Sequence, residues 1–244
     1  QIEEMTLGYK KKKEFFIKEL AEGIGQIVAA FWPKPVIVRL SDFKTNEYRN
    51  LVGGELFEPD EANPMLGWRG ASRYYDERFQ PAFEMECQAI KIVRDIFGLK
   101  NIWTLVPFCR TIEEGKKVIE IMAREGLKRS KEFKIIVMAE IPSNVILAEE
   151  FLEIFDGMSI GSNDLAQLIL GLDRDSALVA GVGDERNEAV KEMIKKIIGT
   201  CRKKKKYCGI CGEAPSVWPE FAAFLVKEKI ESISFNHQSL IKMI

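Results

Sequence analysis

The stretch KIIVMAEIPSNVILAEEFLEIFDGMSIGSNDLAQLIL, residues 134–170, decides the fold class. An apolar run over 134–141 is followed by apolar residues at helical spacing over 144–155, with Ser143 placed to cap that helix. GMSIG, 157–161, then begins the same alternation again. Strands that alternate with helices form parallel sheets, whose strands are covered on both faces and read as continuous apolar runs. The stretch therefore predicts a parallel β/α fold.

The same alternation continues on both sides of this stretch. The sequence predicts seven strands, at 36–40, 65–70, 102–108, 134–141, 157–161, 207–211 and 232–235, with helices between them, among them 11–31, 81–97, 113–126, 186–206 and 219–229. An open doubly wound sheet usually carries a glycine-rich phosphate loop, and neither GxGxxG nor GxxxxGK[ST] occurs here. The pattern favours one domain over 1–244, a (β/α)₈ TIM-type barrel that lacks its first strand and is a fragment of a larger protein.

Composition narrows the class of protein. The chain has 36 Lys and Arg against 37 Asp and Glu, so no basic field would attract nucleic acid or an anionic membrane. No apolar run reaches the length of about 18 residues that crosses a bilayer. Five cysteines without a regular framework favour a reducing compartment, the cytoplasm.

Polar side chains recur where the predicted strands end, which is the rim on which barrel enzymes build their active sites. Each has an ordinary explanation, because a strand-end arginine often forms a salt bridge and an Asn-Asp pair often caps a helix. Their recurrence at equivalent positions favours a functional rim. The residues are Arg39, Arg69, Glu140, Asn163 with Asp164, and Cys211.

These residue types suit a small anionic metabolite. Glu140 and Asp164, with oxygen-bearing Ser162 and Asn163 beside them, suit a hard cation such as Mg²⁺ that keeps several of its waters. Planar guanidinium groups pair with both carboxylates and phosphates. A thiol facing such a site could add or remove a proton at carbon.

The two cysteines of YCGIC, Cys208 and Cys211, could in principle form a CxxC zinc or redox site. The segment reads as a short strand, however, on which side chains three residues apart point to opposite faces. We therefore expect Cys211 to be a single thiol at the end of a strand.

Several longer motifs carry a resemblance to a known family. VIVRLSDFKTNEYRNLVGGELFEPDEANPMLGWRGASRYY, EIPSN, DGMSIGSNDLAQLILGLDRDS and GICGEAPS resemble the phosphoenolpyruvate-binding barrel of the phosphoenolpyruvate-utilising enzymes. This family includes phosphoenolpyruvate synthase (pyruvate, water dikinase), pyruvate phosphate dikinase and enzyme I of the sugar phosphotransferase system. The flanking SDFKTNEY and GEAPS look like the synthase branch.

The resemblance implies a role for each residue of the rim. Arg39 and Arg69 would bind the carboxylate and phosphate of phosphoenolpyruvate, and Glu140 and Asp164 would bind Mg²⁺. Cys211 would move the C3 proton between pyruvate and its enolate. The substrate would be lined by Gly161, Ser162 and Asn163.

The resemblance also implies partners. Family members pass phosphate from ATP through a phosphohistidine on a separate domain, and no Thr-x-His segment of that kind occurs here. We expect the chain to work with phosphohistidine and ATP-binding domains of a longer homo-oligomeric enzyme, and to be inactive in the full reaction by itself. Two alternatives stay open: a dikinase that uses phosphate in place of water, and a noncatalytic assembly module.

Overall fold

The computed structural model describes residues 1–173 and 176–243. Arg174 and Asp175, which fall within the motif quoted above, and Ile244 lie outside the described residues. The chain divides into two compact units. The first comprises Gln1–Pro107 with Glu113–Ile135, and the second Phe108–Ile112 with Ile136–Ile244.

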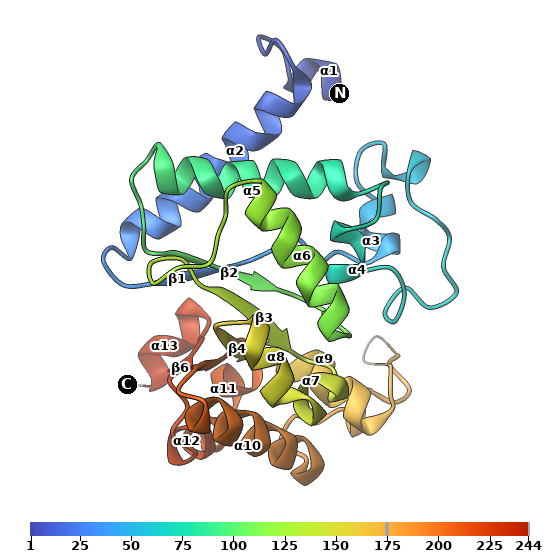
Figure 1. Cartoon of the computed structure of the whole chain (residues 1–244). Helices are drawn as coiled ribbons and strands as arrows, with labels where there is room; N and C mark the ends of the chain where they lie inside the picture. The colour runs from blue at the N-terminus through green and yellow to red at the C-terminus, as the bar shows by residue number, and fades with distance from the viewer. Residues whose placement is uncertain (174–175, 244) are drawn as a thin grey trace. The chain divides into compact units, whose positions relative to one another are not determined.

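The first unit combines long helices with a pair of parallel strands (Figure 1). β1 pairs with β2 in parallel, from Val36 opposite Ile102 to Arg39 opposite Leu105. Its elements are α1 (Ile2–Met5), α2 (Lys12–Ala30), β1 (Val36–Arg39), α3 (Thr45–Arg49), η1 (Gly54–Leu56), α4 (Ala71–Tyr74), α5 (Gln80–Asp95), β2 (Ile102–Val106) and α6 (Ile112–Arg124).

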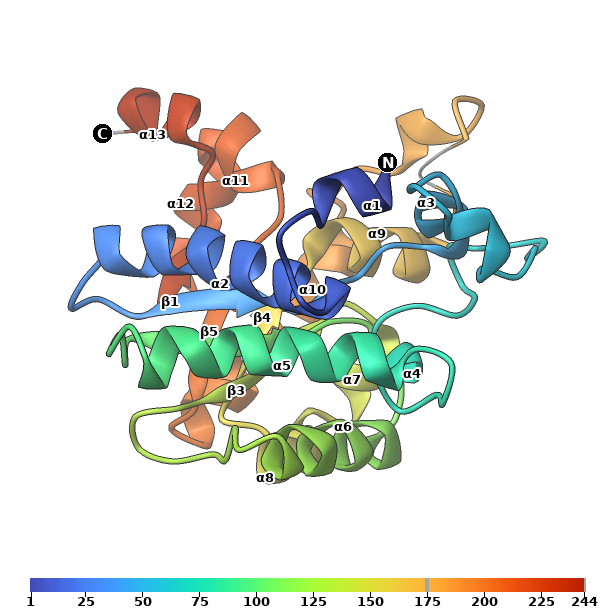
Figure 2. The ribbon, with the colours of Figure 1, turned by 90° about the horizontal axis from the view of Figure 1, so that it is seen from above.

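α2 and α5 pack against each other, and Figures 1 and 2 show them side by side. α2 buries Ile17, Ala21, Ile24 and Val28, which are spaced three or four residues apart and therefore share one face of the helix. The helix ends just before Trp32-Pro33, as the proline predicts. The apolar face of α2 is therefore covered by α5.

The second unit is built on parallel strands that pair in chain order, β3 with β4, β4 with β5, and β5 with β6. Every residue of β3 and β4 is buried, as the continuous apolar runs predict. Its elements are β3 (Ile135–Ala139), α7 (Pro142–Ile146), α8 (Ala148–Ile154), β4 (Gly157–Ile160), α9 (Ser162–Leu170), η2 (Ala180–Val182), α10 (Glu188–Lys203), β5 (Tyr207–Ile210), α11 (Ala214–Val217), α12 (Pro219–Lys227), β6 (Ser232–Ile233) and α13 (His237–Met243).

The α/β class with parallel strands is confirmed, and the alternation is consistent with part of a TIM-type barrel. The predicted strand at 65–70 is wrong, so the described residues form six strands and not seven. This segment turns instead: Leu66 N donates to the Asn63 carbonyl, and Gly70 has a φ of 56° that suits glycine and ends any extended run.

The expected Ser143 cap is also wrong. The predicted helix over 144–155 is two helices, α7 and α8, which meet at Leu147. Ser143 lies inside α7, and its hydroxyl donates to the Arg110 carbonyl at 2.9 Å. The capping acceptor is the Asn144 side chain, which accepts from the Ile141 N–H at 3.0 Å.

Among the described residues, no helix has the length and hydropathy needed to cross a bilayer.

Candidate functional site

In the first unit, the predicted arginines lie in different settings. Arg39 is the last residue of β1 and is exposed. Arg69 follows no strand, contrary to the expectation, and lies in the loop before α4 with its side chain 4% exposed. Its Nε donates to Asp42 Oδ1 at 3.1 Å and its Nη2 to Asp42 Oδ2 at 2.6 Å. This bidentate geometry fixes the plane of the guanidinium group.

The loop that carries Arg69 is held by Arg73, whose side chain is fully buried. Arg73 Nε donates to the Trp68 carbonyl at 2.8 Å, and its two terminal nitrogens donate to the Glu58 carboxylate. The guanidinium group also stacks over the rings of Trp68 and Tyr48, with its central carbon 4.0 and 4.5 Å from the ring centres. Arg73 thus ties residues 58 and 68 of the long loop to α4.

A buried carboxyl group supports the loop from the side of α5. Ser41 donates to Glu86 Oε1 twice, from its backbone N at 2.9 Å and from its hydroxyl at 3.0 Å. The Tyr74 hydroxyl donates to the Ser41 carbonyl at 2.6 Å. Burial raises the pKa of Glu86 to about 7, against an ordinary value of 4.5. The segment directly after β1 therefore rests on a group that titrates near neutral pH.

In the second unit, Glu140 follows β3 directly and is only 1% exposed. Its Oε1 accepts from the Phe108 N–H at 2.6 Å. Its Oε2 lies against Gly161, where a Cβ atom would come within 2.9 Å of it. The structure thus brings the end of β3 next to the residue that precedes α9.

The first turn of α9 carries the other predicted oxygen ligands. Ser162 and Asp164 are buried, and Asn163 is half-buried. The Glu213 N–H points to Asn163 Oδ1 at 3.5 Å, so the turn after β5 meets the start of α9. Within this segment, Gly161 is the residue that lies against Glu140.

The two cysteines separate as expected. Cys208 lies on β5 and is buried, while Cys211 follows β5 and is the exposed one among the five cysteines. The Cys211 thiol accepts from the Ser159 hydroxyl at 3.4 Å and points to the Ile160 carbonyl at 3.5 Å. A hydrogen bond with Cys201 and burial raise the pKa of Cys208 well above its ordinary value, which keeps that thiol protonated.

Sequence reasoning missed Glu185, which lies in the loop before α10. Its residue is 8% exposed, and its Oε1 and the buried Ser162 Oγ form no hydrogen bond of good geometry among the described residues, although the Ser162 side chain acts on Glu185 and lowers its pKa. Both atoms lie against Gly212, where an added Cβ would clash with Ser162 Oγ. Burial raises the pKa of Glu185, and Glu213 adds to the rise. No periodicity or motif in the sequence identifies this carboxyl group as a candidate. Only the structure does, because it shows that Glu185 is buried next to Gly212.

The donor set of the second unit fits a magnesium ion. Mg²⁺ is held in proteins by one or two carboxylates and retains waters, and Glu140 and Asp164 are the carboxylates that would hold it here. Among the described residues, no three or more His, Cys, Asp and Glu side chains are grouped so that they could hold a metal ion. Close packing of Glu140 Oε2 on Gly161 keeps a carboxylate oxygen at the start of α9.

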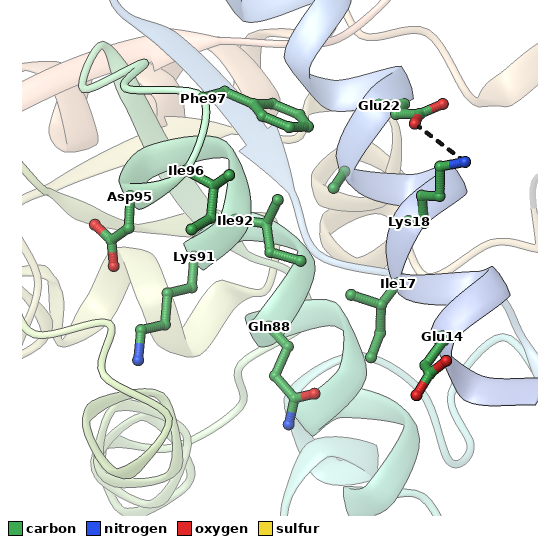
Figure 3. A pocket seen from close by; sticks show the side chains of 11 residues that line it. Glu14, Ile17, Lys18, Glu22, Gln88, Lys91, Ile92, Asp95, Ile96 and Phe97 are labelled. Carbon is green, nitrogen blue, oxygen red and sulfur yellow. Dashed lines mark ion pairs between the residues drawn. The ribbon is translucent and has the colours of Figure 1, made fainter. Parts of the chain in front are cut away.

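A separate pocket of about 610 Å³ lies between α2 and α5 (Figure 3). Ile17 and Lys18 line it from α2, and Gln88, Ile92 and Ile96 line it from the α5 side. None of the predicted site residues is among the eleven that line it. It is an apolar groove distinct from the polar residues described above.

Comparison with known proteins places these residues in a family. The family described as PEP-utilising enzyme, PEP-binding domain, matches residues 3–243. The chain is 58% identical over 242 residues to a phosphoenolpyruvate synthase of Helicobacter pylori, 58% identical over 242 residues to that of Aquifex aeolicus, and 54% identical over 243 residues to that of Escherichia coli.

Each match covers 99% of this chain but 28% to 31% of the relative. The chain therefore spans about 30% of the length of the curated relatives it matches. The match runs through both units and includes every predicted site residue. The chain belongs to the PEP-utilising enzyme family, as its PEP-binding domain.

Proposed function

We propose that this chain is the pyruvate- and phosphoenolpyruvate-binding catalytic domain of a phosphoenolpyruvate synthase, which converts ATP, pyruvate and water to AMP, phosphoenolpyruvate and phosphate. The observation that carries the proposal is the family match over residues 3–243, with 54% to 58% identity to proteins of that name. Phosphorylation of a histidine by ATP belongs, in this proposal, to other domains of the full-length enzyme.

Arg39 and Arg69 bind the carboxylate and phosphate of the substrate. A guanidinium group pairs with both anions through two parallel N–H donors, provided that its plane is fixed. The bidentate contact of Arg69 with Asp42 supports this role, because it holds the plane of Arg69 before any anion arrives.

Glu140 and Asp164 would hold Mg²⁺, and Gly161, Ser162 and Asn163 would line the substrate beside it. When bound, the ion supplies positive charge that stabilises an enolate oxygen. The chain itself contributes acceptors that are already in place: the Phe108 N–H holds one oxygen of Glu140, and the other lies at Gly161.

Cys211 transfers the proton at C3. Its thiolate removes a proton from the methyl group of pyruvate, the C–H electron pair forms the C=C bond, and the carbonyl electrons move to oxygen. The enolate oxygen then attacks the phosphorus of the phosphohistidine, and the N–P bond breaks. In the reverse direction the Cys211 thiol returns the proton to C3. The exposure of this thiol supports the role, since substrate must reach it.

Exchange of the methyl protons of pyruvate in D₂O with Mg²⁺, followed by proton NMR, tests this assignment. Cys211→Ala should abolish exchange and leave oxalate binding nearly unchanged, because oxalate resembles enolpyruvate and needs no proton transfer. Cys208→Ala is the matched control and should retain exchange, since Cys208 is buried on the strand.

Equal loss of exchange in both cysteine variants, or stoichiometric zinc in the wild-type protein, would favour a CxxC metal or redox site instead. The isolated chain should make no phosphoenolpyruvate from ATP and pyruvate. Turnover by the chain alone would contradict the proposed division of labour between domains.

A further inference from the structure

The side-on contact between Asp42 and Arg69 carries a further inference. We infer that Asp42 is a positioning residue of the proposed substrate site, which sets the plane of the Arg69 guanidinium group and is itself held through Ser41 by Glu86. The inference rests on the role given to Arg69 in the proposed function. All four residues belong to the first unit.

The contact is buried and uses both oxygens of the carboxylate. The side chains of Arg69 and Asp42 are 4% and 1% exposed. Arg69 donates two parallel hydrogen bonds to Asp42, at 3.1 and 2.6 Å. Because the guanidinium group is held at two points, its plane cannot rotate as it could around a single hydrogen bond. A third contact, from Arg69 Nη1 to the Met65 carbonyl at 3.3 Å, ties the same group to its own loop.

Asp42 is held in turn from the side of α5. The neighbouring residue, Ser41, donates twice to Glu86 Oε1 and accepts from the Tyr74 hydroxyl through its carbonyl oxygen. Ser41 thus has its N–H, its hydroxyl and its carbonyl all engaged by side chains of α4 and α5. The backbone that presents Asp42 is anchored on the helices, although it lies in a loop.

Charge and orientation predict opposite effects, which makes the inference testable. Removal of the Asp42 negative charge would by itself strengthen binding of an anion at Arg69. Loss of orientation would weaken it, because a two-point contact with an anion needs both N–H donors aligned with the two oxygens. If removal of the Asp42 charge lowers the affinity for an anion, the orientation of Arg69 outweighs the change in charge.

The chain offers a matched control. Asp76 and Arg78 form the same side-on contact, at 2.8 and 2.7 Å, but on the surface, where the side chains are 26% and 63% exposed. Asp76→Asn makes the same chemical change as Asp42→Asn at a pair that is not part of the proposed site.

The experiment is calorimetric titration of the 244-residue chain with oxalate in the presence of Mg²⁺. Asp42→Asn should weaken oxalate binding at least about tenfold, the loss expected for one charge-assisted hydrogen bond, and Asp76→Asn should leave it unchanged. In an Arg69→Lys background, where the oriented guanidinium is already gone, Asp42→Asn should add less than about a twofold change. Thermal unfolding of each variant confirms that it is folded.

Three outcomes would overturn the inference: unchanged or tighter binding by Asp42→Asn, an equal loss in the wild-type and Arg69→Lys backgrounds, or an equal loss in Asp76→Asn. Wild-type affinity in Arg69→Lys itself would instead contradict the proposed function.

If Asp42→Asn does not fold, Ser41→Ala provides the test, because it removes one hydrogen bond to Glu86 and leaves the contact between Asp42 and Arg69 in place. It should weaken oxalate about threefold in the wild-type background and not in Arg69→Lys, and no loss in folded Ser41→Ala would overturn the anchoring.

Discussion

The carboxylate of Glu140 lies against the backbone of Gly161, so closely that a Cβ atom at position 161 would come within 2.9 Å of Oε2 and 3.0 Å of the Glu140 Cβ. The glycine therefore determines where a buried carboxylate oxygen lies relative to the first turn of α9. Glu140 cannot retreat easily, because its other oxygen accepts the Phe108 N–H.

Gly161→Ala should displace Glu140 and lose most Mg²⁺-dependent oxalate binding, with a loss of about 1 to 3 kcal/mol in the free energy of unfolding from overpacking. Gly199→Ala is the control, since a Cβ there meets nothing within 4 Å and the residue lies within α10. That variant should be unchanged or more stable by up to about 1 kcal/mol, and should bind oxalate normally. Chemical unfolding and oxalate titration measure both effects. Normal oxalate binding by Gly161→Ala would separate Glu140 from the metal site.

Glu140 and Asp164 should behave as one unit toward the metal. Either substitution to Ala should remove most Mg²⁺-dependent oxalate binding, and the double substitution should add little, because groups that hold the same ion are not additive. Titrations with and without Mg²⁺ provide the measurement. Independent, additive losses, or binding that is insensitive to Mg²⁺, would place the metal site elsewhere and leave the family assignment intact.

Arg73→Lys should destabilise the fold even though it keeps the positive charge. A lysine cannot reproduce the two-pronged contact with Glu58 or the stacking on Trp68, so we expect a loss of about 2 to 4 kcal/mol in the free energy of unfolding. Arg78→Lys is the control: Arg78 also stacks on Trp68, at 4.3 Å, but is exposed, and we expect no measurable change. Urea unfolding measures both variants. Equal stabilities would show that the buried contacts of Arg73 do not hold the loop.

Glu86 should make stability depend on pH. Its pKa is about 7 in the folded chain and near 4.5 when unfolded, so the folded state binds more protons between these values. Its contribution is fully present below pH 4.5, and stability falls as the pH rises through 7. Glu86→Gln should remove this decline, and Glu84→Gln, on the same helix, should not. Unfolding curves across this pH range that coincide in slope for wild type and Glu86→Gln would contradict the assignment.

The parallel α/β class could be predicted from the sequence, because apolar runs and helical spacing are local patterns that do not depend on distant residues. Alternation along a strand also predicts that Cys208 and Cys211 diverge, and the structure buries Cys208 on β5 and leaves Cys211, just after it, exposed. The positions of Glu140, Asp164 and Cys211 followed from the ends of predicted strands.

Tertiary structure alone decided what supports these residues. Asp42 meets Arg69 from 27 positions away and Glu86 meets Ser41 from 45, and no local pattern records which distant partner a polar group finds. The segment 65–70 forms no strand although its apolar residues predict one, because it turns at Leu66 and at Gly70, whose φ is 56°, and its Arg69 side chain contacts the distant Asp42. Buried polar groups must find partners wherever the fold supplies them, and that requirement acts through space and not along the sequence.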